Sequence, residues 1–113
     1  MDCIFCKIIK KEIPAEMVYH DDAMIAFRDQ HPQAPIHQLI VPKKHIATLN
    51  DLSDNDTILI GHLFQTARHL AKKAGIDKSG YRTVINCNKN GGQEIFHLHI
   101  HLLGGRTFVW PPG

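Results

Sequence analysis

The sequence predicts an α+β domain, because two different hydrophobic periods occur along its 113 residues. Between positions 97 and 102, polar and apolar residues alternate strictly, which is the period of a β-strand. Between positions 60 and 74, apolar residues recur at three- and four-residue spacings, which is the period of an amphipathic helix. A chain of this length is expected to form one domain over residues 1–113, and a domain this small often gains stability by oligomerising.

The composition indicates a globular intracellular protein whose chemistry operates near neutral pH. Nine histidines accompany a formal net charge of only +2. Histidine changes its charge near neutral pH and binds metals, whereas so small a net charge does not indicate a surface that binds nucleic acid. No apolar run approaches the roughly 20 residues of a membrane span, and no leader peptide is evident. We therefore expect a soluble protein of the cytoplasm, or also of the nucleus, without nucleic-acid or membrane partners.

The remaining elements follow from the same two periods and from turn residues. A short helix is expected over Asp2–Lys11, and short strands are expected at Met17–His20, Met24–Arg28, Gln38–Val41 and Tyr81–Cys87. Asp21–Asp22 indicates a tight turn, and two prolines indicate a loop over residues 29–37. The long helix is expected over Ser53–Ala74, with a capping box of Ser53 and Asp56 and a C-terminal stop at Gly75. This helix must cover one face of the sheet.

Cys3 and Cys6 lie three residues apart, so both thiols point to the same side of a helical turn. Such a pair can form a redox centre, half of a zinc site, or two packed thiols without metal. A thioredoxin-type centre normally follows a strand, and none precedes this pair. Half of a zinc site needs two more ligands, for which His45 and His97 are the candidates. With Cys87 the cysteines number three, and an odd number argues against a disulfide framework.

The segment from Gln93 to Leu102 is expected to be a strand with three imidazoles on one face and a core on the other. His97, His99 and His101 occupy alternate positions, which repeat every 6.5–7 Å or so along a strand. His97 and His101 are then too far apart to share one metal, so a catalytic row is favoured over a metal site. The alternative is a half-exposed strand that is merely rich in histidine. Residues 90–92, Asn-Gly-Gly, can turn tightly and present free amides to a phosphate.

These motifs resemble the histidine triad family. The family's form is three histidines separated by single apolar residues and followed by two further apolar residues. The segment His97-Leu98-His99-Ile100-His101-Leu102-Leu103 has this form. The Gly-Gly-Arg at 104–106 and the Trp-Pro-Pro-Gly at 110–113 resemble its Hint branch, the nucleoside phosphoramidases. Further matches lie at residues 4–9, 32–37, 41–45 and 91–93, so the resemblance covers nearly the whole chain.

The resemblance implies an architecture that periodicity alone does not show. It implies a five-stranded, mostly antiparallel sheet with one long and one short helix. Two copies would form a homodimer with a ten-stranded sheet, and the tail over residues 106–113 would reach the partner's active site. It also implies a structural zinc on Cys3, Cys6, His45 and His97, and no catalytic cofactor. Packed, metal-free side chains remain the alternative at these four positions.

The resemblance also implies the chemistry. His99 would attack phosphorus and become transiently adenylylated, His101 would donate a hydrogen bond to the phosphate or the leaving atom, and His37 would support the site through a relay. His97 belongs to the triad and is counted both with the catalytic residues and with the zinc ligands. The reaction would hydrolyse adenosine 5′-phosphoramidates, including AMP–lysine, to AMP and an amine. The alternatives are a dinucleoside polyphosphate hydrolase, a nucleotide-binding regulatory or scaffold protein, and a zinc-binding adaptor.

The remaining implied site residues would bind the nucleotide. Asp29 would accept the ribose hydroxyls, Asn86 would hold nucleotide and phosphate oxygens, and Gly92 and Gln93 would contact the phosphate. From the residues alone, Asp29 and Asn86 could equally be turn residues. Gln30 departs from the usual apolar residue, which bears on base packing. Glu94 stands where animal members usually have serine, so we expect it to favour amine leaving groups that carry positive charge.

Overall fold

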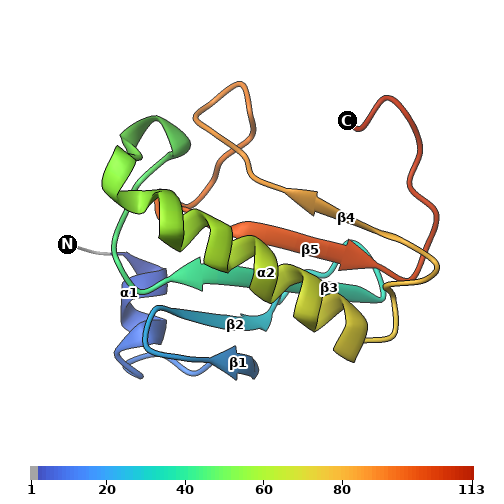
Figure 1. The fold of residues 1–113 in the computed structure, drawn as a ribbon, viewed down its shortest axis with the longest axis horizontal. Helices are drawn as coiled ribbons and strands as arrows, with labels where there is room; N and C mark the ends of the chain where they lie inside the picture. The colour runs from blue at the N-terminus through green and yellow to red at the C-terminus, as the bar shows by residue number, and fades with distance from the viewer. Residues whose placement is uncertain (1–2) are drawn as a thin grey trace.

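The structure, a computed structural model that describes residues 3–113, is built on a five-stranded sheet in the order β1-β2-β3-β5-β4 (Figure 1). All neighbouring strands are antiparallel. The strands are β1 (Met17–His20), β2 (Met24–Arg28), β3 (Ile36–Pro42), β4 (Tyr81–Val84) and β5 (Ile100–Gly104). The helices are α1 (Ile4–Ile9) and α2 (Thr57–Lys73), and 3-10 turns lie at Leu49–Asp51 and Asp54–Asp56. The predicted α+β fold, with one long and one short helix, is confirmed.

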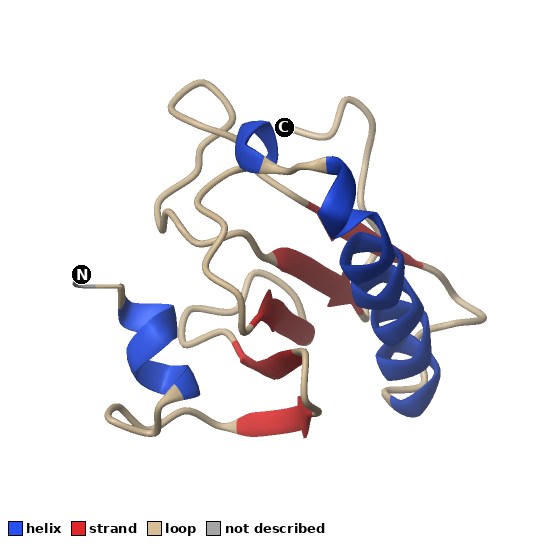
Figure 2. Cartoon of the chain, turned by 60° about the vertical axis from the view of Figure 1, so that its left-hand side comes forward, coloured by secondary structure: helices blue, strands red, loops and turns tan. Residues whose placement is uncertain are grey.

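The two helices lie on opposite faces of the sheet (Figure 2). The α2 face carries the larger core, made of Met24, Ala26, Ile40, Leu63, Ala67, Leu70, Ala71, Ile76, Ile100 and Leu102. The α1 face carries a smaller cluster, made of Cys3, Phe5, Ile8, Ile25, Phe27, Leu39 and Val41. Because successive residues of a strand point to opposite faces, β2 and β3 supply residues to both clusters. The prediction that the long helix covers one face of the sheet is confirmed, and the second face is left to α1.

Strand register places part of the triad on the α1 face. Phe27 pairs with Leu39 across β2 and β3, and Leu39 pairs with His101 across β3 and β5. Cross-strand partners point to the same face, so these three side chains form one row. Adjacent strands lie 4.7–4.9 Å apart, so the row is roughly 10 Å long. An apolar position on β2 is thereby connected to a histidine on β5.

The histidine strand is shorter than predicted, and its exposure is different. β5 begins at Ile100, because the β3–β5 ladder begins at the pair Ile40–Ile100, so His97 and His99 lie ahead of the strand. Upstream, the amide of Leu98 donates to the carbonyl of Ile46 at 2.6 Å instead of to a neighbouring strand. Both sides of this segment are buried, since His97 is 0%, Leu98 is 1% and His99 is 8% exposed. The prediction of a single strand from Gln93 to Leu102 is therefore wrong.

Other predicted boundaries are also wrong by a few residues. α1 ends at Ile9 rather than Lys11, which has a positive φ of 64°, and Asp2 lies outside the described residues. β3 begins at Ile36, inside the predicted loop, because Ile36 pairs with Gly104. β4 ends at Val84 rather than at Cys87, because its last partner on β5 is His101.

The turn and cap signals were more accurate than the boundaries. The Asp21 carboxylate accepts the amides of Ala23 and Met24 at 2.7 and 2.9 Å, which closes the predicted turn. The capping box of Ser53 and Asp56 is present, although it starts a 3-10 turn that leads into α2. Gly75 has a φ of +76° and follows the end of α2, as predicted. Within residues 3–113, no helix combines the length and apolar character needed to cross a membrane.

Candidate active site

Most of the predicted site residues line one cavity of about 470 Å³ on the α1 face. Its predicted members are Asp29, His37, Asn86, Gly92, Glu94, His99 and His101. They come from the end of β2, from β3 and β5, and from the loop that leads to the triad. The cavity therefore collects imidazoles, carboxylates and an amide at one place on the sheet.

A second cavity of about 570 Å³ adjoins the first and is largely apolar. Residues that line both cavities are Phe5, Asp29, His31, Leu39, Glu94 and Ile95. The second cavity adds Ile8 and Phe27 to its walls and Gln30 to its rim. The two cavities form one groove with a polar end at the histidines and an apolar end against α1, which suits a flat ring carrying a charged group.

His99 has its lone pair fixed by a neighbouring carbonyl. Its Nδ1 lies 2.7 Å from the backbone oxygen of His97. A carbonyl can only accept, so Nδ1 carries the proton and donates, and Nε2 of the neutral ring keeps the lone pair. Burial lowers the pKa of His99 below its usual value, against smaller opposing effects of the His97 carbonyl and of Asp29. The ring is therefore neutral at physiological pH, with a lone pair on Nε2 that could attack an electrophile.

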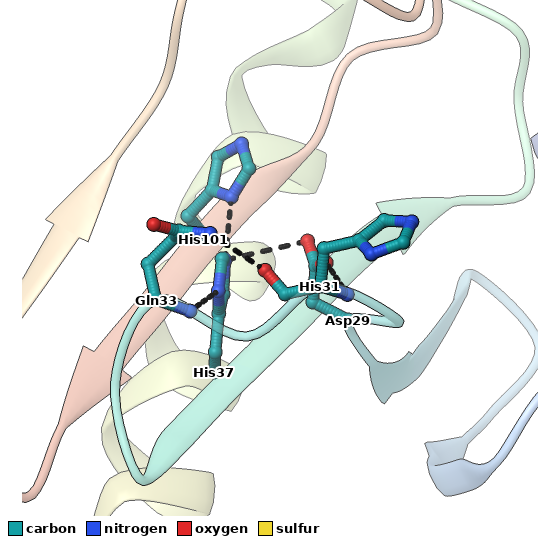
Figure 3. Close-up of polar contacts among 5 residues, drawn as sticks. All are labelled: Asp29, His31, Gln33, His37 and His101. Atoms are coloured by element: carbon teal, nitrogen blue, oxygen red, sulfur yellow. Dashed lines mark hydrogen bonds and ion pairs between the residues drawn. The ribbon is translucent and has the colours of Figure 1, made fainter.

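His37 and His101 form a relay of hydrogen bonds whose direction is also fixed (Figure 3). The amide of Gln33 donates to Nδ1 of His37 at 3.0 Å, so the proton of His37 is on Nε2. That Nε2 lies 2.9 Å from Nδ1 of His101 and donates to it. His101 consequently carries its own proton on Nε2, as a donor. Burial, together with His99 and His37, lowers the pKa of His101 to about 4.

Asp29 lies beside the relay, where the two cavities meet. Its Oδ1 accepts the amide of His31 at 2.8 Å, and its Oδ2 lies 3.4 Å from Nε2 of His37 (Figure 3). Burial lowers the pKa of His37, and the negative charge of Asp29 opposes that shift. A carboxylate held in this way has lone pairs left for hydroxyl donors at the junction.

The glycine loop is closed on itself more tightly than the sequence indicated. The amide of Gly92 donates to the carbonyl of Lys89 at 3.0 Å, and the amide of Gln93 donates to the carbonyl of Asn88 at 3.1 Å. These two amides are thus used inside the loop, and the expectation of free amides is wrong for Gly92. Gly91 is required, because a Cβ there would lie 2.5 Å from the carbonyl oxygen of Cys87.

The side chain of Gln93 is buried and holds the loop to its surroundings. Its Oε1 accepts the amide of Asn88 at 2.9 Å, and its Nε2 donates to the carbonyls of Ala47 and Ile95 at 2.8 and 3.1 Å. Gln93 does not line either cavity of the groove. The structure therefore shows a loop-fixing contact for this residue.

Cys3, Cys6, His45 and His97, which we call the Cys–His group, meet beneath the histidine segment and could hold a metal ion. Nδ1 of His97 lies 3.4 Å from Sγ of Cys3, 3.6 Å from Sγ of Cys6 and 3.1 Å from Nδ1 of His45. Nδ1 of His45 is 3.4 Å from Sγ of Cys6. Nε2 of His97 donates to the carbonyl of Pro42 at 2.7 Å, so its Nδ1 presents a lone pair to the group.

The ring of His97 thus faces the Cys–His group, while its carbonyl orients His99. His97 does not line the groove. Residues that the sequence did not single out as site residues are Phe5, Ile8, Phe27, Leu39 and Ile95 in the apolar wall, and Gln33 and His31 near the relay. The apolar ones carry the same pattern as core residues, so no signal distinguishes them.

The family model, the related sequences and the similar solved structures all indicate the same family. The model of the HIT domain matches residues 10–108. An uncharacterised HIT-like protein of Synechococcus elongatus is 54% identical over 112 residues, which are 99% of this chain and 97% of the relative. The crystal structure of a HIT family hydrolase from Legionella pneumophila matches with a TM-score of 0.98 at 54% identity, covering 99% of this chain and 100% of that one. A histidine triad protein from Clostridium difficile matches with a TM-score of 0.93 at 46% identity, covering 96% and 95% of the two chains.

Acid should destabilise the fold, because the buried histidines of the site are held neutral. The native pKa of His101 is about 4, whereas an unfolded histidine has a pKa near 6.5. The unfolded chain then binds more protons between these values, so the free energy of unfolding falls as the pH drops through this window. His101 accounts for at most about 3 kcal/mol of the free energy of unfolding, and this stabilisation relative to acid pH is fully present above pH 6.5 or so.

Urea denaturation near pH 7 and near pH 5 measures this dependence. His101→Asn should flatten it, whereas His69→Asn, which removes an exposed histidine of α2, should leave it unchanged. A free energy of unfolding that rises toward acid pH would contradict the neutral state of these rings.

Proposed function

The chain belongs to the HIT domain family, and we propose that within it the protein is a nucleoside phosphoramidase of the Hint branch. The substrates are adenosine 5′-phosphoramidates, including AMP–lysine, and the products are AMP and an amine. One observation carries the proposal: Nε2 of a neutral, buried His99 holds its lone pair in a cavity that opens onto an apolar pocket. A nucleophile for phosphorus and a place for a base are thereby present in one groove.

The reaction proceeds in two displacements at phosphorus. Nε2 of His99 attacks, a phosphorus–nitrogen bond to the ring forms, and the bond to the amine breaks. The leaving nitrogen takes a proton from solvent and departs as an amine, and the water that attacks in the second displacement returns a proton to solvent. Nε2–H of His101 donates to a phosphoryl oxygen or to the leaving atom, since the relay from His37 leaves the proton of His101 on that nitrogen. Water then attacks the nucleotidyl-histidine, which releases AMP and restores the neutral ring.

The rest of the nucleotide follows the groove. The phosphate occupies the end with His99, His101, Asn86 and Gly92, and Asp29 accepts the ribose hydroxyls at the junction. The purine lies in the apolar cavity against α1 and β2. The row from His101 to Phe27, roughly 10 Å long, gives the required separation of phosphate and base. Gln30 at the rim supplies a polar contact where the family usually has an apolar one.

The Cys–His group fits a structural Zn²⁺. Bonds of about 2.0 Å to nitrogen and 2.3 Å to sulfur in a tetrahedral site separate the ligand atoms by roughly 3.3–3.8 Å. The nitrogen–nitrogen distance is 3.1 Å, and the nitrogen–sulfur distances are 3.4–3.6 Å. The hydrogen bond from Nε2 of His97 to the carbonyl of Pro42 fixes the tautomer of His97 and leaves its Nδ1 free to bind a metal, as in metal-bound histidines. Four protein ligands close such a site, so the metal supplies stability rather than an activated water.

Loss of the nucleophile tests the proposed reaction. His99→Ala should lower turnover of a fluorogenic adenosine phosphoramidate by at least about a thousandfold, because no other ring nitrogen takes its place at the phosphorus. AMP binding, measured by calorimetry, should persist within several-fold, since the apolar wall and Asp29 remain. His69→Ala, on the exposed side of α2, is the matched control and should keep full activity. Binding without turnover in the wild-type protein would favour a nucleotide-binding regulatory protein instead.

Glu94 should select for positively charged amines. It is exposed and lines both cavities, near the position of the leaving group. The attraction between this exposed carboxylate and a positively charged amine is worth on the order of 0.5–1 kcal/mol, so Glu94→Ser should lower kcat/KM about two- to fivefold for a lysyl phosphoramidate. A neutral amine phosphoramidate should change little, and Glu94→Gln should behave like Glu94→Ser. Equal effects on both substrates would remove this role.

A homodimer would cover the surfaces that a single chain leaves open. β4 is an edge strand, and beyond it the tail over residues 106–113 extends from the body of the domain (Figure 1). Val109 is 73% exposed and Trp110 is 84% exposed. Pairing of β4 with a second β4 would give a ten-stranded sheet and would occupy the open edge. The tail would then reach the partner's active site.

Sedimentation equilibrium tests the dimer directly. We expect twice the mass of one chain at micromolar concentration, because edge pairing and burial of the tail act together. A single-chain mass at that concentration would contradict the proposal.

A further inference from the structure

α1 lies between the Cys–His group and the nucleotide groove and contributes to both. Cys3, at its N-cap, and Cys6 belong to the group, while Phe5 and Ile8 line the groove. A helix of six residues is too short to be stable by itself. Its position is therefore set by what it contacts.

Phe5 is the residue that joins the two sites. It is 3% exposed, and its ring meets the ring of His99 edge-on, with centroids 5.0 Å apart at 89°. It also contacts His97 at 5.9 Å and Phe27 at 5.5 Å, again edge-on. Phe5 lines both cavities of the groove. A shift of this ring would change the wall on which the nucleotide is packed.

Without metal, the Cys–His group holds α1 by weak contacts. A thiol is a poor hydrogen-bond donor, and the contacts of Cys3 and Cys6 to the imidazoles are 3.4–3.6 Å long. Metal–ligand bonds to the same atoms are far stronger, and in small domains they supply much of the folding free energy. The apolar contacts of Ile8 with the α1-face cluster do not depend on metal, so α1 would loosen rather than be lost.

We propose that metal occupancy of the Cys–His group sets the affinity for nucleotide, with Phe5 as the positioning residue that transmits it. Bound metal clamps α1 against the histidine segment and closes the apolar end of the groove. Loss of metal frees Phe5 and opens that wall. The inference rests on the proposed function only in that the groove binds a nucleoside monophosphate.

The reaction step itself should be largely independent of the metal. His97 keeps its Nε2–H bond to the carbonyl of Pro42, and His99 keeps its Nδ1–H bond to the carbonyl of His97. Both bonds tie the nucleophile to β3 and to its own segment rather than to α1. The metal should therefore act on KM and leave kcat within about twofold.

The test compares zinc-loaded wild-type protein with protein stripped by a chelator, with zinc content measured by mass spectrometry. Removal should weaken AMP binding about tenfold by calorimetry and raise KM by a similar factor, a change equivalent to roughly 1.4 kcal/mol. Adding zinc back should restore both. Hydrogen exchange should increase in residues 4–9 and stay constant in α2. Cys6→Ser gives a second metal-free form if chelation unfolds the wild type.

Phe5→Ala tests the transmitting residue. In zinc-loaded protein it should weaken AMP binding, and zinc removal should then have little further effect, because the two changes act through the same ring. Ile8→Ala is the matched control: it removes apolar wall from the same helix, so affinity falls while the response to zinc remains.

Equal AMP affinity in loaded wild type, stripped wild type and Cys6→Ser would overturn the inference and leave the proposed function intact. Failure to bind zinc would overturn it as well. Absence of AMP binding in every form would instead remove the proposed function.

Discussion

The hydrogen bond from Nδ1 of His99 to the carbonyl of His97 is the contact on which the site depends. At 2.7 Å, and with an acceptor that cannot donate, it leaves the lone pair of the neutral ring on Nε2. Burial keeps the ring neutral by lowering its pKa. The relay through His37 works in the same way and leaves a proton on the outer nitrogen of His101. Backbone groups thus leave a lone pair on the outer nitrogen of one ring and a proton on the outer nitrogen of its neighbour, as the proposed roles of nucleophile and donor require.

The division of the sheet into two faces explains how so small a chain supports this site. α2 covers a continuous apolar core on one face, which fixes the strands. The other face is covered only in part, by the six residues of α1, and the uncovered part is the groove. Stability and chemistry are thereby assigned to different faces, with β3 and β5 contributing to both. The Cys–His group connects α1 to the rest of the domain, because Cys3 and Cys6 at the start of this short helix belong to it.

The sequence was informative where a local pattern decides the outcome. The helix period, the capping box and the turn at Asp21 each depend on neighbours within a few residues, and all three were found. The start of β5 at Ile100 could not be predicted in this way, because it depends on where β3 offers a partner. Phe5 and Phe27 were missed as groove residues because a pocket wall and a core share one apolar pattern. Residues of the triad were identified by their spacing together with a family resemblance, but their tautomers required the positions of backbone carbonyls and amides.

The most direct test of this account is the protonation state of His99 itself, read by ¹⁵N nuclear magnetic resonance of histidine-labelled protein near pH 7. We expect a neutral ring with hydrogen on Nδ1 and a bare Nε2, as the carbonyl of His97 dictates. A ring protonated on Nε2 alone, or a doubly protonated ring, would have no lone pair directed at the groove and would contradict the account.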